Sequence, residues 1–140
     1  MPSVFTRIIN GEIPGSFVWR DEIAVGFMSI NPISAGHTLV VPIAEVDHWI
    51  DLPQATAAHL MAVGHTIGQA LQRAFSPDRI GLIVAGFEVP HTHLHVLPIN
   101  SIADLDFHNA AKVPDFPAIA SWAEAIRTEL RAAGVSEVVS

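Results

Sequence analysis

The sequence predicts an α+β fold, in which several β-strands pack beside one long helix. Three observations carry this prediction. Runs of β-branched and aromatic residues alternate with turn residues over residues 17–42, and residues 53–75 repeat apolar side chains every three or four positions. Two further apolar runs then flank Gly86.

The first strands are expected in the N-terminal third of the chain. Residues 17–20 and 23–30 flank the acidic turn Asp21-Glu22, which predicts an antiparallel hairpin. The next strand is expected at residues 36–42, after the turn-like sequence NPISAG.

The long helix is expected at about residues 53–75, with Asp51 as its N-cap. Its apolar stripe consists of Leu60, Val63, Ile67 and Leu71. After it, residues 79–86 and 89–98 are expected to form two strands joined by a tight connection around Gly86.

A second helix is expected at about residues 116–133, ending at Gly134. Trp122, Ile126 and Leu130 form its apolar stripe. Over its 140 residues, of which 50% are hydrophobic, the chain contains no repeat or linker, which predicts a single domain spanning residues 1–140.

Composition excludes several classes of protein. With 14 acidic and 7 basic residues, the formal charge is −7, which argues against a nucleic acid backbone as partner. The chain has no cysteine, which rules out a disulfide framework. It contains neither a targeting segment nor an apolar run long enough for a membrane helix, so we expect no membrane partner and a cytoplasmic location.

The sequence VPHTHLHVLP, residues 89–98, carries three of the chain's eight histidines in strict alternation. In a strand, alternate side chains leave on opposite faces, so His91, His93 and His95 share one face about 6.5 to 7 Å apart. Thr92, Leu94 and Val96 then pack into the core.

Three interpretations of the histidine face remain open. Single histidines at half-buried strand positions are usually satisfied by backbone carbonyls and water, but three in alternation are hard to explain in this way. Imidazole is a common zinc ligand, although only Glu88 nearby supplies an orienting carboxylate. A phosphoryl group fits when one imidazole is the nucleophile and others stabilise negative charge.

The segment HTHLHVL, residues 91–97, resembles the His-x-His-x-His-x-x signature of the histidine-triad (HIT) superfamily of nucleotide hydrolases and transferases, apart from the polar Thr92. Residues 4–42 are similar to the N-terminal half of that family, in which Phe-x-x-Ile-Ile-x-Gly-Glu-Ile-Pro leads through a hairpin to Gly-His-x-Leu-Val-x-Pro. The Hint-like branch in bacteria is the most similar part of the family.

The resemblance implies a role for each histidine. His93 would attack the α-phosphorus of a nucleoside phosphoramidate, ester or anhydride and form a covalent nucleotidyl-histidine that water hydrolyses. His95 would hydrogen-bond the phosphoryl oxygen. His91 would orient the nucleophile through its backbone carbonyl and exchange protons with His37, and no metal or cofactor would be needed.

The resemblance also implies a fold and a binding pocket. The family fold is a five-stranded antiparallel sheet with one long helix, and two such sheets usually join in a homodimer. Ile8, Phe27 and Ile30 would lie around the base of a purine nucleoside monophosphate-type substrate.

Several positions depart from the family pattern. Ser3, Thr6 and Glu45 stand where zinc-containing members have two cysteines and a histidine, which predicts no zinc site. Ser29 stands where many members have an aspartate that holds the ribose hydroxyls, and a neutral hydroxyl binds more weakly than a carboxylate. Gly86 is retained, Phe87 replaces a glutamine, and Glu88 stands where some members have a hydroxyl.

Glu88 has two interpretations, as a solvated loop carboxylate or as a functional group that acts as general acid or repels a second phosphate.

From the resemblance, the chain is predicted to be a nucleotidyl hydrolase or transferase of the phosphoramidase kind. The alternative is a catalytically weak nucleotide-binding or partner-binding module that retains the triad.

Overall fold

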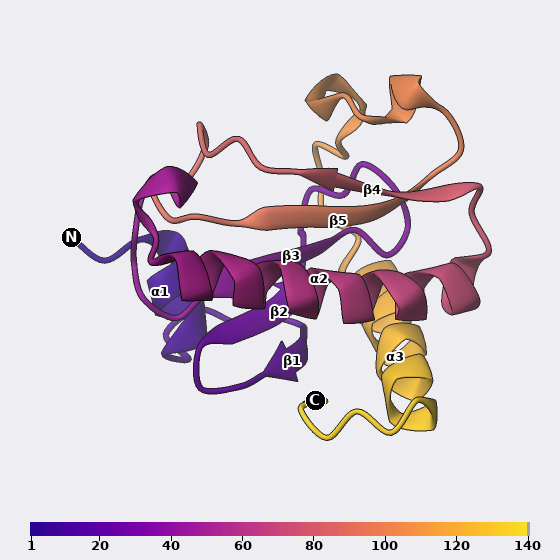
Figure 1. The fold of residues 1–140 in the computed structure, drawn as a ribbon. Coiled ribbons are helices and arrows are strands. Elements are labelled where there is room, and N and C mark those ends of the chain that lie inside the picture. Colours follow the sequence, from indigo (N-terminus) through magenta and orange to yellow (C-terminus); the bar gives the residue numbers. More distant parts are fainter. Residues whose placement is uncertain (140) are drawn as a thin grey trace.

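The fold consists of one sheet and three helices, shown in the computed structural model of Figure 1, which describes residues 1–139. The predicted domain range of 1–140 ends one residue beyond this part of the chain. In chain order, the helices and strands are α1 (Val4–Ile9), β1 (Phe17–Arg20), β2 (Ala24–Met28), β3 (Thr38–Pro42), α2 (Gln54–Phe75), β4 (Arg79–Ile83), β5 (Leu94–Ile99) and α3 (Phe116–Ala132). Short 3-10 helices span Trp49–Asp51, Ile102–Asp104 and Phe107–Asn109.

The sheet has five strands in the order β1-β2-β3-β5-β4, and every neighbouring pair is antiparallel. The prediction of a five-stranded antiparallel sheet with one long helix and a C-terminal helix is confirmed. β3 and β5 meet at the centre with Leu39 opposite His95 and Val40 opposite Leu94. This register decides which side chains of the two strands share a face.

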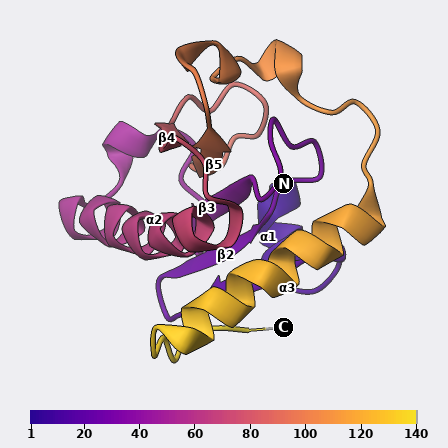
Figure 2. The same cartoon turned by 90° about the vertical axis from the view of Figure 1, so that its right-hand side faces the viewer.

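One face of the sheet packs against α2 and α3. α2 runs along β3 and β5, and α3 lies against α2 and β1 (Figures 1 and 2). Val40, Leu94 and Val96 point into this layer. The helices contribute fully buried side chains, which include Leu60, Ile67, Leu71, Ile126 and Leu130. Burying a large aliphatic side chain contributes about 1.5–3 kcal/mol, so this layer supplies most of the driving force for folding.

The opposite face carries a smaller apolar cluster beneath α1. Its buried members are Phe5, Ile9, Val25, Phe27, Leu39 and Val41. Because Leu39 and His95 are paired across β3 and β5, His95 lies on this side of the sheet as well. The sheet therefore lies between the main core and His95.

The predicted N-cap of the long helix is wrong. α2 begins at Gln54 after Pro53, which has a φ of −55° and makes no side-chain capping bond. Asp51 lies in the preceding 3-10 helix instead. Pro53 holds the N-cap position with a ψ of 140°, and its side chain has no acceptor for the first N–H groups of the helix.

The predicted tight connection between the last two strands is also wrong. β4 ends at Ile83 and β5 begins at Leu94, so residues 84–93 form a long connection. Gly86 has a φ of +92°, which glycine adopts without strain, and the backbone N–H of Thr92 bonds to the carbonyl of Val46 instead of to β4.

As a result, His91 lies in a bend and His93 directly precedes β5, so that only His95 is in the strand. Within residues 1–139, no helix combines the length and the apolar character that crossing a membrane requires.

Candidate active site

A pocket of about 450 Å³ opens on the face of the sheet that α2 and α3 leave uncovered. Eight of the ten predicted site residues line it: Ile8, Phe27, Ser29, Ile30, His37, Glu88, His93 and His95. His91 is fully buried behind the pocket wall, and Gly86 also lies outside the lining. A pocket of this volume is of the size that small-molecule sites have.

One half of the pocket is apolar. Ile8 and Phe5 come from α1, and Phe27 comes from β2, with the rings of Phe5 and Phe27 packed edge to face at 5.5 Å. Ile30 is half exposed. Ser29 follows β2 directly, and its hydroxyl accepts a hydrogen bond from the backbone N–H of Asn31.

The imidazole of His93 has its orientation fixed by the main chain. Its Nδ1 lies 2.7 Å from the carbonyl oxygen of His91, and a carbonyl can only accept, so Nδ1 carries the proton. In the neutral ring the lone pair then belongs to Nε2. The side chain is 3% exposed and lines the pocket, and the ring of Phe5 packs against it at 4.9 Å.

His37 and His95 form a second, separately oriented pair. The backbone N–H of Ile33 donates to Nδ1 of His37, so in neutral His37 the proton is on Nε2. That Nε2 lies 2.9 Å from Nδ1 of His95, which must accept, and the proton of neutral His95 is therefore on Nε2.

Both rings of this pair remain neutral at pH 7. Burial, followed by the neighbouring imidazoles of His95 and His93, lowers the pKa of His37 to about 3. Burial and then His93 lower the pKa of His95 to about 4, although the carboxylate of Glu88 acts in the opposite direction. The tautomers derived from the hydrogen bonds are consequently those of the resting protein.

Nε2 of His95 is a buried donor without a partner among the described residues. Buried polar groups are almost always hydrogen-bonded, because an unsatisfied donor costs about 1–3 kcal/mol. This N–H is adjacent to His93, whose ring centroid lies 4.8 Å from that of His95. An acceptor oxygen of a bound ligand would satisfy it.

Among the described residues, the ring nitrogens of His91 bond to Pro42 and Ser3, and its proton exchange with His37 stays a prediction. Nε2 of His91 donates to the carbonyl of Pro42 at 2.7 Å, and Nδ1 lies 2.7 Å from the hydroxyl of Ser3. Burial lowers the pKa of His91 most, while the hydrogen bond to Pro42 raises it by a smaller amount. Both ring nitrogens of His91 are therefore hydrogen-bonded.

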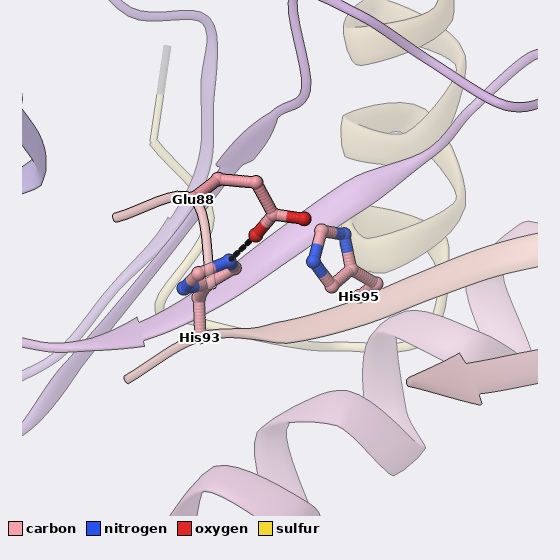
Figure 3. Close-up of side chains that lie close together, drawn as sticks. All are labelled: Glu88, His93 and His95. Carbon is pink, nitrogen blue, oxygen red and sulfur yellow. Dashed lines mark ion pairs between the residues drawn. The ribbon is translucent and has the colours of Figure 1, made fainter. Parts of the chain in front are cut away.

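The carboxylate of Glu88 points toward His93, as Figure 3 shows, with Oε2 3.7 Å from Nε2. This distance is too long for a direct hydrogen bond. The side chain is half exposed, at 51%, and stands at the side of the pocket that carries the two histidines.

Glu88, His93 and His95 are close enough together to be considered as metal ligands. The hydrogen bonds argue against that assignment. Nε2 of His95 carries the proton that His37 and Ile33 impose, and an imidazole nitrogen must lose its proton to bind a metal. The donor set therefore fits an oxyanion better than a cation.

The three positions that replace the family's zinc ligands do come together. The backbone N–H of Ser3 and the hydroxyl of Thr6 donate to Oε1 of Glu45, at 2.6 Å and 2.7 Å. These hydrogen bonds lower the pKa of the Glu45 carboxyl. The cluster reaches His91 through the Ser3 hydroxyl.

Sequence reasoning missed Phe107. Its ring packs edge to face against His95 at 4.9 Å, and it lines the pocket from the 3-10 helix Phe107–Asn109. The connecting segment from β5 to α3, orange in Figure 2, crosses above the sheet to bring it there. Asn31 and Pro32 fix this segment by hydrogen bonds to the backbone of Ala111. The DFHN sequence carries no pattern that predicts such a long-range contact.

Known proteins share both the sequence and the fold. An uncharacterized HIT-like protein of Borreliella burgdorferi is 34% identical over 102 residues, covering 68% of this chain and 73% of its own. The adenylylsulfatase HINT3 of Arabidopsis thaliana is 30% identical over 100 residues, covering 68% of this chain and 51% of its own. The hypothetical histidine triad nucleotide-binding protein of Sulfolobus tokodaii superimposes with a TM-score of 0.81 at 25% identity, over 92% of each chain.

The family model described as HIT domain matches residues 10–102, which include the sheet, α2 and all four site histidines. The match ends before Phe107 and α3. Together with the HIT-like relatives, it shows that this chain belongs to the HIT family.

Proposed function

We propose that the protein is a nucleotidyl hydrolase or transferase that acts on the α-phosphate of nucleoside phosphoramidates or related nucleotide conjugates. One observation carries the proposal. The lone pair of His93 Nε2 and the unpaired N–H of His95 Nε2 lie side by side in one pocket. A nucleophile and a donor for the oxyanion are what phosphoryl transfer needs.

In the first step, Nε2 of His93 attacks the α-phosphorus, and the bond from phosphorus to the leaving nitrogen breaks. The carboxyl group of Glu88 gives its proton to the departing amine. In the second step, water attacks the phosphorus, the bond to Nε2 breaks, and the proton of the water returns to Glu88. The N–H of His95 donates to a phosphoryl oxygen in both steps. The Nδ1–H of His93 stays hydrogen-bonded to the carbonyl of His91 throughout.

The apolar half of the pocket supports a purine nucleoside as the bound part of the substrate. Phe5, Ile8 and Phe27 offer flat or aliphatic surface for a base, and Ser29 offers one hydroxyl to the ribose. As the alternative to a general acid, an ionised Glu88 would repel further phosphates and favour amine and ester leaving groups over polyphosphates.

Single-turnover hydrolysis of an adenosine 5′-phosphoramidate tests the proposal. We expect His93→Ala to lose at least about a thousandfold in rate, and intact-protein mass spectrometry to detect a nucleotidyl adduct on the wild type only. His48→Ala, at an exposed histidine of the loop after β3, is the matched control and should retain the wild-type rate.

A catalytically weak nucleotide-binding module is the second candidate, favoured by Ser29, whose hydroxyl has no negative charge to hold a ribose. Equal, near-background rates for wild type and His93→Ala, with nucleotide still bound, would support the module and contradict the enzyme. We also propose a homodimer and a cytoplasmic location, as expected from the sequence and the family.

A further inference from the structure

A hydrogen-bonded cluster of Ser3, Thr6, Glu45 and His91 lies behind the pocket wall. Its members come from the start of α1, the loop after β3 and the connection before β5. His91 is completely buried and Ser3 is 6% exposed, whereas Glu45 is at the surface. The cluster thus extends from solvent to the residue whose carbonyl orients His93.

The direction of each hydrogen bond follows from the groups involved. Nε2 of His91 must donate to the Pro42 carbonyl, so Nδ1 of the neutral ring accepts from the Ser3 hydroxyl. The Ser3 oxygen in turn accepts from the backbone N–H of Thr6, as the N-cap of α1. Glu45 accepts from the Ser3 N–H and from the Thr6 hydroxyl. Two longer contacts link the same groups, from the Ser3 hydroxyl to Thr6 Oγ1 at 3.3 Å and from Thr6 Oγ1 to Nδ1 of His91 at 3.4 Å.

The cluster also anchors α1. This helix has six residues, which is too short to be stable by itself in water. Glu45 accepts hydrogen bonds from the backbone of Ser3 and the side chain of Thr6, which lie 42 and 39 positions earlier in the sequence. The ring of Phe5 on the same helix packs against His91 at 5.9 Å and against His93 at 4.9 Å.

We propose that Ser3 and Glu45 are positioning residues for the nucleophile. Glu45 fixes Ser3 at the start of α1, the Ser3 hydroxyl holds the ring of His91, and the carbonyl of His91 holds Nδ1–H of His93 so that Nε2 faces the substrate. The catalytic consequence rests on the proposed function, whereas the effect on the His93 tautomer does not.

Ser3→Ala removes the hydroxyl, Ser3→Thr keeps it, and Glu45→Gln keeps the size of the side chain but not its charge. With an adenosine phosphoramidate, we expect kcat of Ser3→Ala to fall roughly fivefold to tenfold, with KM changed less than about twofold, because one oriented hydrogen bond is lost and no ligand contact changes. Ser3→Thr should recover most of the loss. The double variant Ser3→Ala/Glu45→Gln should lose less than the product of the two single losses, since both act through the same bonds.

Matched controls separate positioning from a general loss of stability. Thr66→Ala removes an exposed hydroxyl on α2, and Glu22→Gln neutralises an exposed carboxylate in the turn between β1 and β2. Both should leave kcat unchanged. Thermal unfolding of every variant shows how much of each loss comes from unfolded protein.

Nitrogen-15 NMR of the imidazoles tests the positioning without any turnover. The wild type should have His93 entirely in the Nδ1–H form, and Ser3→Ala should show a mixture of tautomers while the exposed His65 is unchanged. A His93 tautomer that Ser3→Ala does not alter, or a kcat within twofold of an active wild type, would overturn the proposal. A wild type without phosphoramidase activity would count against the proposed function alone, because the NMR result still decides the positioning.

Discussion

At the scale of single residues, the site depends on histidines that are buried without charge. Burial and the neighbouring imidazoles lower the pKa of His37 to about 3 and that of His95 to about 4, against about 6.5 in an unfolded chain. Between these values the unfolded chain binds more protons than the folded protein, so the free energy of unfolding falls as the pH falls. From about pH 7 to about pH 5, each histidine should lower it by on the order of 2 kcal/mol.

Urea unfolding across this pH range measures the effect. His95→Gln should make the free energy of unfolding less dependent on pH, because one of the two histidines with a lowered pKa is removed. His48→Gln, at an exposed position in the loop after β3, should leave the pH dependence as it is. A wild-type free energy of unfolding that stays constant between about pH 5 and pH 7 would contradict the neutral, buried histidines.

Ser29 should limit the affinity for ribonucleotides. Ser29→Asp places a carboxylate at the same point of the pocket, and a charge-assisted hydrogen bond is about twice as strong as a neutral one. We expect KM for an adenosine phosphoramidate to fall by about fivefold, and KM for its 2′,3′-dideoxy analogue to remain unchanged. Steady-state kinetics with the two substrates measures the difference, and an equal change in both KM values would show that residue 29 does not bind the ribose.

At the scale of elements, the segment between β5 and α3 completes the pocket with Phe107. Edge-to-face pairs contribute about 0.5–1.5 kcal/mol, so Phe107→Ala should lower kcat/KM by roughly threefold to tenfold through a less restrained His95. Because Phe107 is 38% exposed, the melting temperature should change little. Phe116→Ala, at the more exposed start of α3, is the control, and an unchanged kcat/KM for Phe107→Ala would mean that the segment is only a connection.

The turn between β1 and β2 is fastened to α2 through Asp21. Its carboxylate accepts from the Trp19 indole, from the backbone N–H groups of Ile23 and Ala24, and from His59 on α2. Burial raises the pKa of Asp21, but these hydrogen bonds outweigh it and lower the pKa to about 2.

Asp21→Ala should therefore destabilise the fold by about 2–4 kcal/mol, measured by urea unfolding, without changing KM. The contrast with Asp51 is informative. Asp51→Ala removes the predicted but incorrect N-cap of α2 and should alter the free energy of unfolding by less than about 0.5 kcal/mol. A larger loss of unfolding free energy for Asp51→Ala than for Asp21→Ala would contradict the structural role of Asp21 and the absence of a capping role for Asp51.

At the scale of the whole molecule, the parts of the fold that a repeating pattern encodes were predictable. Leu60, Val63, Ile67 and Leu71 repeat with the helical period and are all buried in the core. Leu94 and Val96 point to the core while His95 does not, as strand alternation requires. α1 was not predicted, because six residues are too few to establish a period.

The arrangement of the site was predictable only in part. The resemblance identified the four histidines, but the partner of His37 depends on the register that sets Leu39 opposite His95. The apolar Val84 and Val89 extended the two predicted strands to residues 86 and 89, whereas Gly86 and the bond from Thr92 to Val46 turn the chain away from β4. Contacts between distant segments, such as Ser3 with His91, leave no local trace in the sequence.

The edge strand β4 argues for a second copy of the chain. β4 pairs with β5 on one side only, and a groove of about 300 Å³ runs between β4 and α2. Gly64 and Gly68 line the α2 side of this groove and place no side chain in it. Leu82 and Met61 also line it and are 42% and 53% exposed. An unprotected edge with apolar side chains is a surface on which another strand pairs.

We expect light scattering to give twice the mass of the chain for the wild type and the mass of one chain for Leu82→Lys, because a charge in the groove would be buried without a partner. Val113→Lys, at an 80% exposed position between β5 and α3, should remain dimeric. If the wild type were monomeric, or if Leu82→Lys stayed dimeric, β4 would not be the interface. If Leu82→Lys is monomeric as expected and retains kcat, each chain contains a complete site, as the distances within one copy imply.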